Sequence, residues 1–176
     1  MLFRSAGFKF GGTEDPGVYL DEENRRHILN IRAVFAEAAG NLADEGKKEE
    51  ALKLLDQIEK GISPENLPYG MTSRFNNHNQ TGLLYLEAAY KSGNKELAEK
   101  VRLAVRKDLE DQRKYYEYLR NKRPEFYGGS LEGTEVLLNE VMIQILESIE
   151  RHYAPETQPK TTEGPGTIIN TDSTGQ

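Results

Sequence analysis

The sequence contains no cysteine among its 176 residues. Disulfide frameworks, thiolate zinc sites and thiol nucleophiles are therefore excluded, and the redox compartment stays open. No stretch reaches the roughly 20 apolar residues that cross a bilayer, and no apolar run follows the N-terminus as in a signal peptide. An excess of positive charge is also lacking, because the formal net charge is −6. We therefore expect neither membrane insertion of this chain nor a nucleic acid partner, which would need a clustered basic surface.

The composition indicates a soluble, helical, globular chain, with 36% hydrophobic and 30% charged residues. Residues 1–20 are glycine-rich and aperiodic and form an irregular lead-in. Residues 1–5 match what the end of a common sequencing adapter encodes, so we treat them as a hypothetical non-native addition. Residues 21–153 are predicted to form a helical repeat domain, and residues 154–176, rich in Thr, Pro, Gly and Ser, a disordered tail.

An internal repeat is the most informative pattern in the chain. Gly46 and Gly93 each follow one amphipathic segment and precede another, and an alanine stands five positions after each glycine, Ala51 and Ala98. A glycine with positive φ ends a helix and reverses the chain, and a small residue lets the next helix approach closely. We predict an all-α fold of tetratricopeptide-like antiparallel helix pairs, a right-handed α-solenoid, although the unit is longer than the usual ~34 residues.

Apolar residues at helical spacing define the faces that should pack. The first pair presents Ile28, Ile31, Phe35, Ala38 and Leu42, then Ala51, Leu54, Leu55 and Ile58; the second presents Leu83, Leu86, Ala89 and Tyr90, then Leu97, Val101, Ala104, Val105 and Leu109. Residues 136–153 carry Leu137, Leu138, Val141, Ile145, Leu146 and Ile149 and predict a final packing helix.

Several segments between residues 11 and 119 resemble one protein family. They are VYLDEENRR at 18–26, NIR at 30–32, EGKK at 45–48, ALKLLD at 51–56, PY at 68–69, EAAYKSGNK at 87–95 and YY at 115–116. This pattern is similar to the C-terminal soluble region of a family of bacterial multi-pass membrane proteins whose membrane part looks like a protein O-mannosyltransferase-type glycosyltransferase. The sequence departs from that family in lacking the membrane part and its acidic residues, and in the polar character of residues 71–80.

Two functions are considered. The resemblance implies a non-catalytic accessory domain on the periplasmic side of the membrane, which binds or positions an acceptor polypeptide or stabilises the membrane part. The alternative is a free-standing, cytoplasmic scaffold with a peptide-binding groove. The expected partner is therefore a polypeptide or the membrane domain, and neither hypothesis requires a cofactor or catalytic residues in this chain.

Eight residues are candidates to line a ligand groove: Arg25, Arg26, Asn30, Arg32, Arg74, Asn77, His78 and Tyr115. Arg25, Asn30 and Arg32 can share a polar helix face, which is alternatively a solvated or ion-paired surface. Residues 72–80 are interpreted as a loop before a helix starting at Thr81, and this loop presents its side chains to a ligand or merely connects. Tyr115, among basic residues, can stack on a sugar or peptide or pack against the last helix.

Other patterns have structural explanations. The three histidines, His27, His78 and His152, are too widely spaced to suggest a metal site. The Gly-Gly pairs at 11–12 and 128–129 lack the flanking pattern of a phosphate loop. Residues 21–23 (DEE) precede a helix start, where helix capping explains them better than acid–base catalysis.

Overall fold

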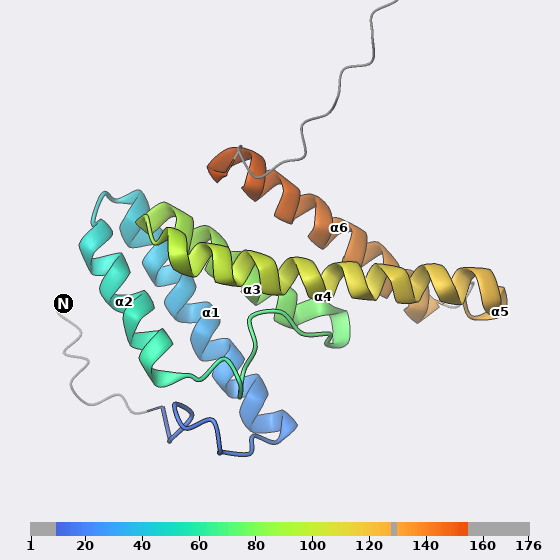
Figure 1. Cartoon of the computed structure of the whole chain (residues 1–176), viewed down its shortest axis with the longest axis horizontal. Helices are drawn as coiled ribbons and strands as arrows, with labels where there is room; N and C mark the ends of the chain where they lie inside the picture. The colour runs from blue at the N-terminus through green and yellow to red at the C-terminus, as the bar shows by residue number, and fades with distance from the viewer. Residues whose placement is uncertain (1–9, 128–129, 155–176) are drawn as a thin grey trace, which may run out of the picture.

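A computed structural model describes residues 10–127 and 130–154, and every regular element in this part of the chain is helical. The elements are α1 (Glu22–Asp44), α2 (Lys48–Gly61), the 3-10 turn η1 (Arg74–Asn76), α3 (Asn77–Ser92), α4 (Lys95–Lys122), α5 (Pro124–Tyr127) and α6 (Ser130–Tyr153) (Figure 1). The all-α prediction is therefore confirmed. The hypothetical non-native residues 1–5, and the predicted tail at 154–176 except for Ala154, lie outside the described residues.

Local signals set the helix boundaries as predicted. The Asp21 carboxylate accepts a hydrogen bond from the backbone N–H of Asn24 and caps the N-terminus of α1. Gly46 and Gly93 have φ of 81° and 87°, a left-handed conformation that glycine adopts without steric cost. The chain reverses at each glycine, and Ala51 and Ala98 are fully buried at the start of the helices that follow.

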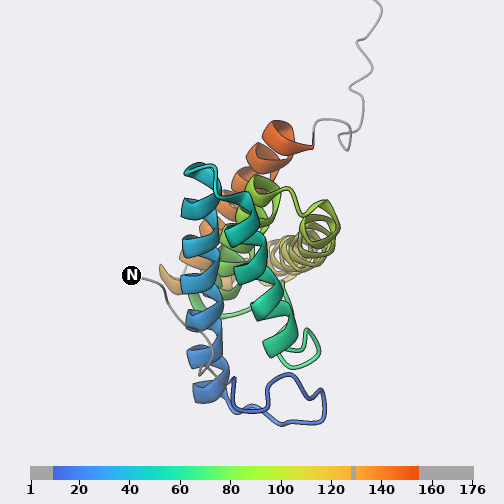
Figure 2. The ribbon, with the colours of Figure 1, turned by 90° about the vertical axis from the view of Figure 1, so that its left-hand side faces the viewer.

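The helices form two layers. α1 packs beside α2 and α3, while α3 also packs on α4, and α6 lies across α3 and α4 (Figures 1 and 2). α1 and α3 run in the same direction, because Arg32 meets Tyr85 near the middle of both helices and Asp44 meets Lys91 at their last turns. α6 follows the same direction. Its first turns meet η1, and its last residue, Tyr153, stacks on Tyr90 of α3 with ring centroids 5.3 Å apart.

The buried face of α1 differs from the predicted one. Of the expected stripe, Ile28 is buried and Ile31, Phe35 and Leu42 pack against the core while only partly buried. The most enclosed residues of α1 are others, namely Arg32, Ala36, Ala39 and Ala43. α1 contacts helices on two sides, so its most enclosed line lies between α2 and α3. The small side chains on that line allow α3 to approach closely.

The prediction for α6 is also partly wrong. Leu137, Val141 and Ile145 were expected to pack, but they are exposed. Leu146 and Ile149 are buried as predicted, and Met142 and Ile143 complete the buried face. α6 rests on α3 and α4 through one side only, so the apolar residues on its other side stay in contact with solvent.

One ion cluster fastens α6 to α4. The buried Glu150 carboxylate accepts hydrogen bonds from Arg102, with Nη1–Oε1 at 3.0 Å, and from Arg106. Glu99 and Glu110, both on α4, hold the two arginines from the other side. A buried carboxylate needs this number of charged donors to offset its desolvation.

The segment between α2 and η1 is part of the core. Ile62, Leu67 and Tyr69 are buried, and Gly70 lies so close to α4 that a Cβ there would stand 2.5 Å from the carbonyl oxygen of Ala104. The lead-in lies across the ends of α1 and α2 (Figure 2), where the buried Thr13 hydroxyl donates to the carbonyl of Gly61 over 2.6 Å. The segment between α2 and η1, which we call the linker, is therefore fixed between α4 and the lead-in, and it positions the start of α3.

Candidate functional site

The exposed sides of α1, α3 and α6 form one surface, which we call the α1–α3–α6 face. On α1 the exposed stripe is turned away from α2, and on α3 and α6 it is turned away from α4. The stripes comprise Asn30, Val34, Glu37 and Asn41 on α1, Asn77, Gln80 and Leu84 with the half-buried Glu87 and Lys91 on α3, and Val141 and Ile145 on α6. Because the three helices run in the same direction, their side chains line up in parallel rows.

A shallow groove of about 70 Å³ runs between α1 and α3 on this face. Its floor consists of Ala36, Gly40 and Ala88, and an added Cβ at Gly40 would lie 4.0 Å from that of Ala88. Small residues bring the helices together there, while longer polar and aliphatic side chains form the walls. One wall residue, Lys91, bridges Asp44 at 2.8 Å and Glu87 at 3.2 Å, and the hydrogen bond to Asp44 is the main cause of its raised pKa.

Aliphatic side chains are exposed along the face. Val34 is 64% exposed, Leu84 37% and Ile145 40%, one from each helix. Single exposed aliphatic residues are common, but these three come from neighbouring helices on one face. The face therefore combines apolar contacts with amide and carboxylate groups that can bind a peptide backbone.

Under this face lies a buried polar cluster centred on Arg32. This side chain is only 1% exposed, and its Nη1 and Nη2 donate to the carbonyls of Pro68 at 2.9 Å and Leu67 at 2.7 Å. The guanidinium lies 5.3 Å from the ring centroid of Tyr69 and 5.9 Å from that of Tyr85. Burial lowers the pKa of Arg32. The two tyrosines and a nearby carboxylate act in the opposite direction and raise it.

That carboxylate belongs to Glu59 on α2. Tyr69 and Tyr85 donate their hydroxyl protons to its two oxygens over 2.7 and 2.8 Å. Burial is the main cause of the raised pKa of both tyrosines, and the charge on Glu59 raises it further. The hydroxyls therefore stay protonated, and the cluster ties α1, α2, the linker and α3 together.

A second polar network fixes the start of α3. Asn76 and Gln112 exchange side-chain hydrogen bonds of 3.2 Å, and Asn79 donates to Asn76 and to Asp108 over 2.7 Å each. Phe75 and Asn76 both have positive φ, 55° and 54°, an uncommon conformation for residues other than glycine. This network holds the strained turn, and Glu135 of α6 accepts the backbone N–H of Phe75.

The polar run 72–80 is therefore not a loop ending at Thr81, as predicted, since α3 begins at Asn77. His78 is buried, and its Nε2 lies 2.5 Å from the carbonyl of Pro68, so it is not presented to a ligand. Burial is the main cause of its lowered pKa. Arg74 is exposed and lies over the ring of Phe75 with 4.8 Å between its Cζ and the ring centroid.

The four candidates on α1 divide between surface and interior. Asn30 is exposed on the α1–α3–α6 face, as is Asn77 of α3. Arg26 is exposed and pairs with Glu23 at 2.6 Å. Arg25 is half-buried and donates to the carbonyl of Leu20, and Arg32 lies in the core. The shared polar helix face predicted for Arg25, Asn30 and Arg32 is therefore not formed.

Tyr115 lies on α4, which is not one of the three helices of the face. It is exposed, with its ring centroid 5.8 Å from that of Tyr116. The structure thus brings Asn30 and Asn77 onto one face, leaves Arg74 at the turn before α3, and separates Tyr115 from them. Sequence reasoning missed Leu84, Ile145 and Glu59, because helical periodicity does not show which apolar residues stay uncovered or which carboxylate is half-buried.

No group of three or more His, Asp or Glu side chains suited to a metal ion occurs in residues 10–127 and 130–154. None of the helices in these ranges has the length and apolar character needed to span a membrane. Comparison of the chain with protein-family models, curated proteins and solved structures finds no match.

Proposed function

We propose that this chain is a non-catalytic, tetratricopeptide-like helical-repeat domain that holds an extended polypeptide segment on the α1–α3–α6 face. Two helix pairs with equivalent glycine turns, followed by a third helix in the same direction as α1 and α3, support this assignment. In such an arrangement the first helices of successive pairs, here α1 and α3, line one surface. α6 occupies the position that the first helix of a third pair would have.

One observation carries the proposal: each of three parallel helices has an exposed aliphatic residue on the same face, and one of these residues, Leu84, borders a groove with a floor of small residues. An extended peptide can place apolar side chains against Val34, Leu84 and Ile145. Exposed amide groups such as those of Asn30 and Asn41 can bind its backbone. No strained nucleophile or metal is needed for this role.

The resemblance over residues 11–119 extends the proposal to an accessory domain of a membrane glycosyltransferase-like protein. In that setting the domain lies on the periplasmic side, and the bound segment is an acceptor polypeptide or part of the membrane domain. A free-standing peptide-binding scaffold would use the same face. The in-frame genomic sequence upstream of Gly7 distinguishes them: a multi-pass membrane segment there supports the accessory role, and a genuine start at Met1 refutes it.

The binding test uses a library of random phage-displayed peptides and the purified chain. We expect wild type to enrich peptides with apolar residues at alternate or every third position, and the double variant Leu84→Ser, Ile145→Ser to lose binding of the selected peptide by at least about tenfold. The control is Leu103→Ser on α4, a leucine outside the face that is more exposed (52%) than Leu84 or Ile145. Enrichment of no peptide, or equal loss in the control, would refute the proposed face.

A further inference from the structure

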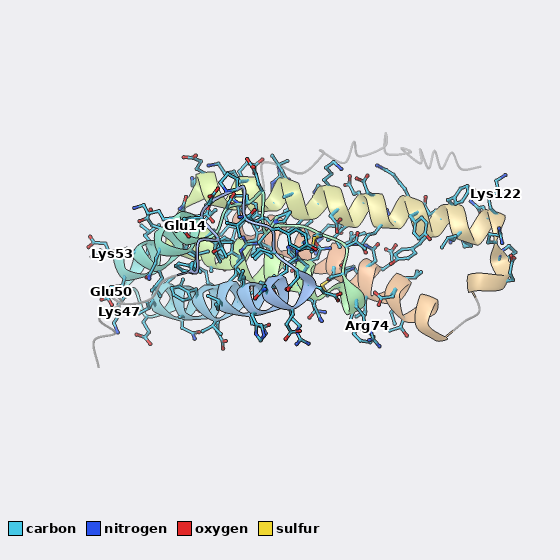
Figure 3. All side chains as sticks on the ribbon, turned by 90° about the horizontal axis from the view of Figure 1, so that it is seen from below. Glu14, Lys47, Glu50, Lys53, Arg74 and Lys122 are labelled. Carbon is cyan, nitrogen blue, oxygen red and sulfur yellow. The ribbon has the colours of Figure 1, made fainter. Side chains whose placement is uncertain are left out.

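The last turns of α4 extend beyond the helix bundle. Figure 1 shows the C-terminal half of α4 continuing past α1, α2 and α3 toward α5, and Figure 3 places Lys122 at the opposite end of the molecule from Lys47 and Lys53. We call residues 113–123 the α4 arm. At about 1.5 Å per residue, the arm is some 15 Å long, which exceeds the Debye length of about 8 Å at physiological salt.

Charge is distributed very unequally between the arm and the rest of the chain. The arm carries the cations Arg113, Lys114, Arg120, Lys122 and Arg123, and a single acid, Glu117. The whole chain has a net charge of −6, so the remainder is strongly acidic. Salt screens most of the acidic bundle from the tip of the arm, while Glu125 of α5 lies at the tip itself and pairs with Arg123.

Two of the five cations of the arm are already paired, Lys114 with Asp111 at 3.2 Å and Arg123 with Glu125 at 3.7 Å. In the bundle, Lys91, Arg102 and Arg106 each form two ion pairs, but Arg120 and Lys122 form none with any residue that the structure describes. Both side chains belong to exposed residues. Their charges surround the helix, since Arg120 and Lys122 lie on different sides of it.

Tyrosines accompany these charges. Tyr115 and Tyr118 are 57% and 59% exposed and lie on one side of the helix with Lys122, at i, i+3 and i+7. The tyrosine ring is apolar with a polar hydroxyl, and it prefers the boundary between water and lipid headgroups. Lysine and arginine next to such rings bind anionic headgroups with their charged ends.

We propose that the α4 arm docks peripherally on an anionic lipid surface. α5 packs on this end of α4, and the exposed cations and tyrosines on the remaining surface of the arm offer no groove for a peptide, but they fit into a layer of headgroups. The acidic bundle is held away from the surface by the length of the arm. This inference depends on the arm alone and is independent of the α1–α3–α6 face.

The test is co-flotation of the full chain with vesicles of phosphatidylcholine, with and without added phosphatidylglycerol. We expect binding only to the anionic vesicles, with release at high salt. Each basic residue near such a surface contributes about a fivefold increase in partitioning, so Lys114→Gln, Arg120→Gln, Lys122→Gln together should lower it about 100-fold. Tyr115→Ser, Tyr118→Ser should lower it further, and circular dichroism checks that both variants remain helical.

The matched control removes three exposed lysines outside the arm, Lys48→Gln, Lys53→Gln and Lys95→Gln, which changes the net charge equally. It should leave partitioning within about threefold of wild type, because these sites lie beyond the screening length from the arm. Equal loss in both triple variants would overturn the proposal. The absence of binding to anionic vesicles would also overturn it. Binding to a soluble polyanion such as polyglutamate or single-stranded DNA, without binding to vesicles, would count against the lipid surface in the same way.

Discussion

Replacing Arg32 by methionine should cost a large part of the stability of this domain. The substitution removes two hydrogen bonds from a charged donor, each contributing about 1.5–3 kcal/mol, and the contacts with two aromatic rings, about 1–2 kcal/mol together. Methionine also removes the desolvation cost of a buried charge, several kcal/mol, which offsets much of this loss. The carbonyl of Pro68 keeps its contact with His78, but that of Leu67 loses its donor.

The balance is a loss of about 3 kcal/mol in the free energy of unfolding. Urea unfolding followed by circular dichroism measures it, and the control is Arg26→Met, an exposed arginine on the same helix whose loss should change stability little. Arg32→Lys should fall between the two, because one ammonium group cannot reach both carbonyls and stack on the rings. If Arg32→Met were as stable as Arg26→Met, the cluster around Arg32 would not hold α1, the linker and α3 together.

Three further predictions follow from single contacts. Since burial lowers the pKa of His78, stability should fall as pH drops from about 7 through the lowered value, and His78→Gln should flatten that pH dependence of the urea midpoint. Gly82→Ala should destabilise the domain by about 1–3 kcal/mol, because the added Cβ would lie 2.6 Å from the Tyr69 carbonyl oxygen. Gly40→Ala should instead stabilise it by about 0.5–1 kcal/mol. Thermal melts in which both variants shift the melting temperature in the same direction would contradict this. Glu150→Ala should cost about 3 kcal/mol and speed hydrogen exchange in α6 first, and unchanged exchange there would show that the apolar contacts alone hold that helix.

The local features of this fold were predictable from the sequence. Gly46 and Gly93 take the positive φ that ends a helix, Asp21 caps α1, and Ala51 and Ala98 are buried where helices meet. Each of these depends on backbone geometry or on side-chain size within one or two turns. The residue types alone therefore predict such short-range features.

The candidate site was less predictable. Asn30 and Asn77 were predicted as ligand contacts and lie on the α1–α3–α6 face. Arg32 and His78 are of residue types that are usually exposed, but both are buried. Their burial requires the carbonyls of Leu67 and Pro68, which reach them only when the linker folds back between α1 and α3. The spacing of apolar residues along a helix does not predict these long-range contacts.

The same distinction applies to α6 and α4. The sequence by itself determined that residues 136–153 are helical and that the arm is basic and aromatic, because periodicity and charge are properties of the residues. Only the tertiary structure decided that Ile145 is uncovered while Leu146 is buried, that Tyr115 is exposed, and that Lys122 lies at one end of the molecule. Burial depends on which neighbours an element meets, and those neighbours come from distant parts of the chain.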